Sequence, residues 1–66
     1  MAHSIFAERL KATRIELCLN REELEVSCSL PKGVCAQYEG GYREPSLVNL
    51  RKIKQGLGID WARLLD

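Results

Sequence analysis

The sequence of 66 residues predicts an all-α, compact five-helix domain, and two observations carry this prediction. Apolar residues recur at the three- and four-residue spacing of a helix in several short segments, whereas no stretch alternates apolar and polar residues over the length of a strand. Glycine, proline, serine and asparagine separate these segments, so we expect turns of about two to six residues. A chain of this length has room for one modest core, and we expect a single domain over residues 1–66.

The first two helices are expected at about 4–17 and 21–28. One face of the first carries residues spaced by four, three and four positions: Phe6, Leu10, Thr13 and Leu17. Before the second helix, Asn20 can accept a hydrogen bond as a cap, and Glu23 can reach back to the backbone N–H of Asn20. We therefore expect a capping box at this helix start.

The third helix is expected at about 31–39. Pro31 cannot lie inside a continuing helix, so the chain must turn near Ser29 and Leu30 before this helix begins. Three apolar residues then fall on one face: Val34, Cys35 and Tyr38. Gly40 and Gly41 supply the conformational freedom that ends a helix.

The last two helices are expected at about 46–56 and 60–65. The fourth opens at Pro45-Ser46 and ends at Gly56 and Gly58. Its apolar face is formed by Leu47, Leu50, Ile53 and Leu57. Asp60 can cap the fifth helix, which carries Trp61, Leu64 and Leu65.

Charge and cysteine content exclude several classes of protein. Ten Lys and Arg against nine Asp and Glu give a formal net charge of +1, so binding to a polyanion depends on where the charges lie. Cys18, Cys28 and Cys35 match neither a disulfide framework nor a zinc motif, and we expect reduced thiols and no metal or cofactor. No apolar run approaches the length of a membrane helix, and no secretion signal is visible.

An enzyme is not expected. His3 is terminal, no serine or cysteine has a base partner, and the domain is too small to enclose a sizeable pocket, so no small-molecule ligand is evident.

Two short helices separated by a turn of about three or four residues have the layout of a helix-turn-helix, whose second helix can lie in a DNA major groove. A set of residues dispersed over segment 6–65 adds to this layout: Arg14, Leu19-Asn20 with Glu23-Leu24, Tyr38-Glu39 with Gly41, Pro45-Ser46-Leu47 with Leu50, and Leu57-Gly58-Ile59 before Leu64-Leu65. In these residues the chain resembles, without gaps, the Cro and phage-repressor type (XRE-like) of helix-turn-helix DNA-binding domain. The resemblance implies a small DNA-binding regulator from a bacterium or phage.

The resemblance also implies the packing of the motif. Its apolar anchors would be Leu24, Cys28, Leu30, Cys35 and Tyr38. Arg14 is expected to pair with Glu39 and so tie the first helix to the end of the third, in the bidentate geometry that an arginine and a carboxylate favour. The alternative is two solvated surface charges.

Contacts to DNA would divide into those that position the protein and those that specify a sequence. By resemblance, phosphate contacts are expected from Arg21, Arg43 and the helix start at Ser46, with ordinary solubilising charge as the alternative for both arginines. The face of the third helix away from the core presents the candidates for base contact: Lys32, Gly33, Ala36 and Gln37.

Several positions depart from the family pattern, among them Arg21, where glutamine is usual, and Pro31, which replaces the usual Ser or Thr cap. Glu25 stands where a small residue is usual and Ser29 where glycine is usual, while Gly33 is expected inside the third helix and would make it less rigid. Either Glu25 turns outward to solvent or the geometry between the two motif helices changes. The residues leave both alternatives open.

The last helix is expected to form a homodimer interface through Trp61, Leu64 and Leu65, with core packing as the alternative for Trp61 and Leu64. The predicted function is that of a cytoplasmic transcriptional regulator, a repressor, that binds operator DNA as a dimer. The alternative is a protein-interaction or antitoxin-like module that keeps the helix-turn-helix fold with weak or no specific DNA binding.

Overall fold

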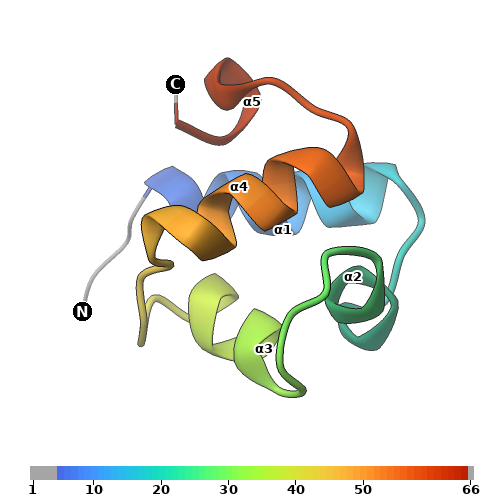
Figure 1. Cartoon of the computed structure of the whole chain (residues 1–66), viewed down its shortest axis with the longest axis vertical. Helices are drawn as coiled ribbons and strands as arrows, with labels where there is room; N and C mark the ends of the chain where they lie inside the picture. The colour runs from blue at the N-terminus through green and yellow to red at the C-terminus, as the bar shows by residue number, and fades with distance from the viewer. Residues whose placement is uncertain (1–4, 66) are drawn as a thin grey trace.

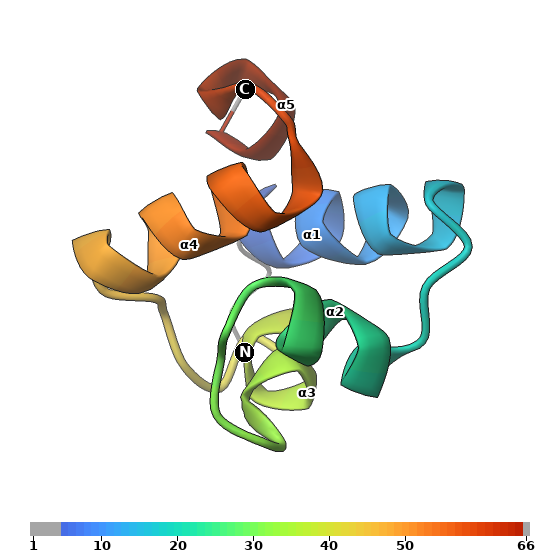
Figure 2. The ribbon, with the colours of Figure 1, turned by 45° about the vertical axis from the view of Figure 1, so that its right-hand side comes forward.

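The computed structural model describes residues 5–65, and within them the chain forms five helices and no strand. The helices are α1 (Ile5–Glu16), α2 (Arg21–Ser27), α3 (Val34–Glu39), α4 (Leu47–Leu57) and α5 (Trp61–Leu65). α1 and α4 occupy the middle of the molecule, with α5 on one side and α2 and α3 on the other (Figures 1 and 2). This arrangement confirms the predicted all-α fold class.

The core is formed by residues of all five helices and of the turn before α3. Its buried residues are Leu10, Leu24, Cys28, Leu30, Val34, Cys35, Tyr38, Ile53 and Leu64. The ring of Phe6 packs edge-on against that of Tyr38, with 6.0 Å between ring centroids. Asn49 Nδ2 donates a hydrogen bond of 3.0 Å to the Tyr38 hydroxyl, which links α4 to α3. All five apolar anchors expected for the motif are buried.

Two residues expected on apolar helix faces are exposed instead. Leu17 is 43% exposed because α1 ends at Glu16 and the chain turns at Cys18, whose φ is 59°. Leu19, beyond the turn, packs against the core in its place. Leu47 is 61% exposed because it is the first residue of α4 and precedes the buried part of that helix.

α4 continues through Gly56, which was expected to help end it. The helix ends one residue later at Leu57, and Gly58 forms the C-cap in the left-handed conformation, with φ 66°. A Cβ atom at Gly56 would lie 2.6 Å from the carbonyl oxygen of Ser27. Gly56 therefore allows α4 to approach the end of α2.

The start of α3 differs from the prediction. The helix begins at Val34 and not at Pro31, because Gly33 adopts φ 89° and forms the N-cap. Gly33 is therefore not an interior helix residue, and the expected loss of helix rigidity does not apply to it. α2 begins as predicted, since the side chain of Asn20 accepts from Glu23 N and the side chain of Glu23 accepts from Asn20 N.

Candidate nucleic-acid interface

α2 and α3 pack against each other and form the helix-turn-helix. α3 also contacts α1, and α2 also contacts α4, so both motif helices rest on the rest of the domain. The connection between them spans residues 28–33, longer than the turn of about three or four residues expected from the motif. The extra length follows directly from the late start of α3.

The residues expected to contact DNA bases are exposed: Lys32, Gly33, Ala36 and Gln37. Ala36 and Gln37 lie on α3, opposite the buried Val34 and Cys35, whereas Lys32 and Gly33 lie in the turn just before the helix. The structure thus leaves these four positions available to a partner while the other face of α3 is buried.

Gln37 and Arg43, a candidate for base contact and one for phosphate contact, are joined in the structure. Arg43 Nη1 donates a hydrogen bond of 3.4 Å to Gln37 Oε1. Both side chains are exposed. A candidate for base contact and a candidate for phosphate contact therefore lie next to each other on the same surface.

Arg21 and Ser46, the other two candidates for phosphate contact, each have a partner within the protein. Arg21 Nε donates to Glu39 Oε1 at 3.3 Å, yet the Arg21 side chain remains 55% exposed. Ser46 is the N-cap of α4, and its Oγ accepts a hydrogen bond of 3.2 Å from Asn49 N. Both side chains remain accessible from solvent.

Glu39, the last residue of α3, is held by two arginines. Arg14 Nε donates to Glu39 Oε2 at 2.6 Å and Arg14 Nη2 donates to Oε1 at 3.2 Å, a bidentate pair. The Glu39 side chain is only 3% exposed, so the two residues are not solvated surface charges. Burial acts to raise the pKa of Glu39, but hydrogen bonds from Arg14, Cys35 and Arg21 outweigh it, and the pKa lies below its usual value.

Cys35 also contacts this carboxylate. Its thiol donates a hydrogen bond of 3.3 Å to Glu39 Oε2. Burial raises the pKa of Cys35 to about 12, and the neighbouring Glu39 carboxylate adds to the rise. The residue therefore remains a neutral thiol at physiological pH and acts as a core residue that also donates a hydrogen bond.

Comparison with known proteins places this motif in a family. No family model matches the chain, and no solved structure matches it. An uncharacterized HTH-type transcriptional regulator of Bacillus subtilis, YqaF, is 33% identical over 53 residues, which span 80% of this chain and 70% of the relative. The chain belongs to the HTH-type transcriptional regulators.

In this HTH-type regulator Glu25 is 5% exposed, so it does not turn outward to solvent, which was one of the two alternatives. α2 and α3 remain in contact around it. Its Oε2 accepts a hydrogen bond of 2.9 Å from the backbone N–H of Cys35 in the first turn of α3. Sequence reasoning missed this contact, because only the packing of the two helices brings residues ten positions apart together in this way.

Tyr42 is an exposed aromatic residue that the sequence analysis did not single out. It is 87% exposed in the loop after α3, beside Arg43, and its backbone N–H donates to the carbonyl of Gln37 at 3.0 Å. Its ring lies against Gly40, where an added Cβ would be 2.5 Å from the ring.

The residues expected at a dimer interface differ in how far they are buried. Leu64 is fully buried in the core, so its side chain is not available to a partner, which corrects the expectation for this residue. Trp61 is half-buried, and Lys54 Nζ lies 5.8 Å from its ring centroid, a cation–π contact. The side chain of Leu65 lies outside the described residues.

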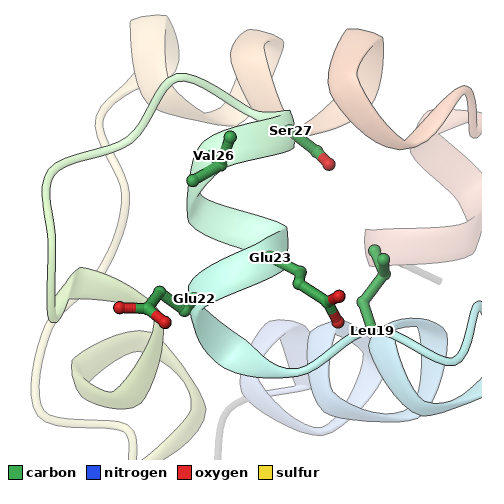
Figure 3. A pocket seen from close by; sticks show the side chains of 5 residues that line it. All are labelled: Leu19, Glu22, Glu23, Val26 and Ser27. Carbon is green, nitrogen blue, oxygen red and sulfur yellow. The ribbon is translucent and has the colours of Figure 1, made fainter.

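A shallow hollow of about 480 Å³ lies on the outer side of α2 (Figure 3). It is lined by Leu19, Glu22, Glu23, Val26 and Ser27. None of these belongs to the residues expected to contact DNA, and two of them are acidic, so the hollow is distinct from the α3 surface.

Within residues 5–65, no group of His, Cys, Asp and Glu is arranged to hold a metal ion. No helix in that span is long and apolar enough to cross a membrane.

Proposed function

We propose that this HTH-type regulator binds double-stranded DNA in a sequence-specific manner, as a repressor of the Cro and phage-repressor (XRE-like) type that occupies an operator as a dimer. The observation that carries the proposal is the state of α3. One face of this helix is buried and its last residue is fixed by Arg14, while Lys32, Ala36 and Gln37 are exposed. A fixed helix with an exposed polar face is what reading of the major groove requires.

The exposed residues match the chemistry of base edges. The Gln37 amide can bond the N6 and N7 edge of adenine, and the ammonium group of Lys32 can reach O6 and N7 of guanine. The methyl group of Ala36 suits contact with a thymine methyl. Arg43, the candidate for phosphate contact, lies within 3.4 Å of Gln37, so a backbone contact and a base contact could be made side by side.

The proposed contacts to phosphate come from Arg43, Arg21 and Ser46. One N–H of Arg21 bonds Glu39, and a guanidinium carries five N–H groups, so the exposed part of Arg21 can still donate to a phosphate. Ser46 lies at the N-terminus of the eleven-residue helix α4, where unpaired N–H groups and the helix dipole favour an anion. These contacts would position the protein without reading a sequence.

The dimer is proposed because one α3 offers little sequence discrimination. Two long polar side chains, Lys32 and Gln37, face the DNA, and each good bidentate contact contributes about 1–3 kcal/mol of discrimination. A two-fold dimer doubles this surface and places the two recognition helices about 34 Å apart, one turn of DNA. The half-exposed Trp61 on α5 remains the candidate contact between the protomers. The protein would act as a repressor, in the cytoplasm of a bacterial cell, by occupying DNA that other proteins need.

The proposal is tested by titrating a labelled duplex pool with the protein at several salt concentrations and following fluorescence anisotropy. We expect affinity to fall as salt rises, and Arg43→Ala to weaken binding to all sequences and reduce the salt slope by about one unit. Lys11→Ala removes one positive charge from the exposed face of α1 and serves as the matched control. Absence of binding at low salt would overturn the proposal and favour a module that binds another protein.

A further inference from the structure

Glu25 is a buried acidic residue that accepts a hydrogen bond from the helix expected to read DNA. It lies on α2, is 5% exposed, and its Oε2 accepts from Cys35 N at 2.9 Å. A glutamate is rarely buried without a partner, because removing its charge from water is costly. The contact with α3 therefore has to offset the burial of this side chain.

The start of α3 lacks a cap of its own. The first N–H groups of any helix have no partner within that helix, and a side chain at the N-cap commonly satisfies one of them. Here the N-cap is Gly33, which has no side chain, and the first turn of α3 contains no acidic residue. Val34 N bonds the carbonyl of Pro31 at 3.3 Å, and the next N–H, that of Cys35, is satisfied by Glu25. The carboxylate also places negative charge at the positive end of the helix dipole.

The other end of α3 is held in a comparable way. Glu39 ends the helix and is bonded by Arg14 from α1. A helix of six residues is not stable by itself, so its position depends on such contacts with its neighbours. Glu25 provides the contact at the end that lies next to Lys32, and Arg14 provides the one at the opposite end.

We propose that Glu25 is a positioning residue for α3: it caps this helix from α2 and thereby sets the position from which Lys32, Ala36 and Gln37 reach DNA. The role in DNA binding rests on the proposed function, whereas the capping of α3 does not. Glu25 takes no part in contacting DNA itself. Loss of the cap should therefore weaken binding, whereas loss of a negative charge near a DNA-binding surface would by itself strengthen it.

Two substitutions separate the reach of the side chain from its charge. Glu25→Gln keeps the length and an acceptor oxygen but loses the charge, and Glu25→Asp keeps the charge but withdraws the carboxylate from Cys35 N by one methylene. Glu22→Gln, on the exposed face of α2, is the control for loss of charge. Because neither substitution at Glu25 empties the site, both variants retain most of the packing around it.

The capping is measured by amide hydrogen exchange of Cys35, with the amide of Leu10 in α1 as the internal reference. We expect exchange at Cys35 to be faster by about tenfold in Glu25→Asp, the change that corresponds to the loss of one hydrogen bond, and within about threefold of wild type in Glu25→Gln. Exchange at Cys35 that is the same in Glu25→Asp as in wild type would overturn the proposal.

The positioning is measured as affinity for a duplex, at a temperature at which circular dichroism shows every variant to be folded. We expect Glu25→Asp to bind about tenfold more weakly than wild type. The affinities of Glu25→Gln and Glu22→Gln should be no more than about threefold weaker than that of wild type. If Glu25→Asp binds as wild type does, Glu25 has only a structural role and the positioning proposal is wrong. A wild-type protein that binds no duplex overturns the proposed function and the DNA role of Glu25, while the exchange experiment still decides the capping.

Discussion

Arg14 bonds both carboxylate oxygens of Glu39, at 2.6 and 3.2 Å, and also donates from Nη1 to the carbonyl of Leu19 at 2.9 Å. One side chain of α1 therefore fixes the end of α3 and the loop that leads into α2.

Removing Arg14 should destabilise the protein severely. In Arg14→Ala, Glu39 would remain buried without its main partner, a situation that costs about 3–5 kcal/mol. This loss equals about the whole stability expected of a small domain, so the variant should be largely unfolded at 25 °C by circular dichroism. The stability of Arg14→Lys should lie between that of wild type and that of Arg14→Ala, because a lysine keeps the positive charge but cannot form the bidentate pair.

The control for this substitution is Lys11→Ala, which removes a positive charge from an exposed position of the same helix. Urea unfolding of this variant should match that of wild type within about 0.5 kcal/mol. A loss of less than about 1 kcal/mol in Arg14→Ala would show that the pair behaves as an exposed salt bridge.

Acid should destabilise the protein through Glu39. Its pKa is lower in the folded protein than in the unfolded chain, so the stabilisation is complete above the unfolded value of about 4.3 and is lost as pH falls through the lower folded value. Melting temperatures measured between pH 7 and pH 3 should fall more steeply for wild type than for Glu39→Gln. Glu8→Gln, at an exposed position of α1, should keep the slope of wild type. Equal slopes in wild type and Glu39→Gln would contradict the assignment.

The three cysteines should differ sharply in reactivity. Cys18 is exposed, whereas burial raises the pKa of Cys28 to about 11 and that of Cys35 to about 12. The thiolate is the reactive form, so at pH 8 a disulfide reagent should modify one thiol rapidly and the other two only after unfolding. Cys18→Ser should abolish the rapid phase. Rapid reaction of a second thiol in the folded protein would show that the core opens on this timescale.

Gly56→Ala should lower stability although alanine favours helices by about 1 kcal/mol over glycine. The added methyl group would lie 2.6 Å from the Ser27 carbonyl oxygen and 2.8 Å from the Cα of Cys28, so α4 and α2 would have to separate. Overpacking of this kind costs about 1–3 kcal/mol, and thermal unfolding should show a net loss. Gln55→Ala, exposed on the same helix, provides the comparison. A gain in melting temperature for Gly56→Ala would mean that the two helices are not in close contact.

Local pattern predicted the helices and much of the core because both follow from spacing. The capping box at Asn20 depends on residues three positions apart, and the burial of Leu24 and Tyr38 follows from helical periodicity. The pair of Arg14 and Glu39 is separated by 25 positions, and it was expected only because the chain resembles a known family.

The features that were missed depend on where elements meet in three dimensions. The late start of α3 arises from the left-handed conformation of Gly33, which a glycine allows but does not require. The burial of Glu25 contradicts the usual exposure of glutamate and is explained only by the N–H of Cys35 that it meets. Leu64 was expected at an interface as well as in the core, and the packing of α5 on α1 decides for the core.

The dimer makes a separate prediction. Sedimentation equilibrium at micromolar concentration should give twice the 7.5 kDa mass of one chain, and Trp61→Ala should shift the equilibrium toward single chains without unfolding them. Ala62→Ser, an exposed position on the same helix, is the control. A mass of 7.5 kDa at all concentrations would contradict the dimer but not the binding of DNA.

The claim that α3 reads DNA sequence is tested most directly by selecting duplexes from a random library with wild type and with Gln37→Ala in parallel. Wild type should enrich one sequence with two related half-sites about one helical turn apart, and Gln37→Ala should lose the preference at one base pair or two in each half-site while the rest of the sequence is retained. If the duplexes recovered with wild type at low salt show no enriched sequence compared with the starting library, sequence-specific binding is contradicted.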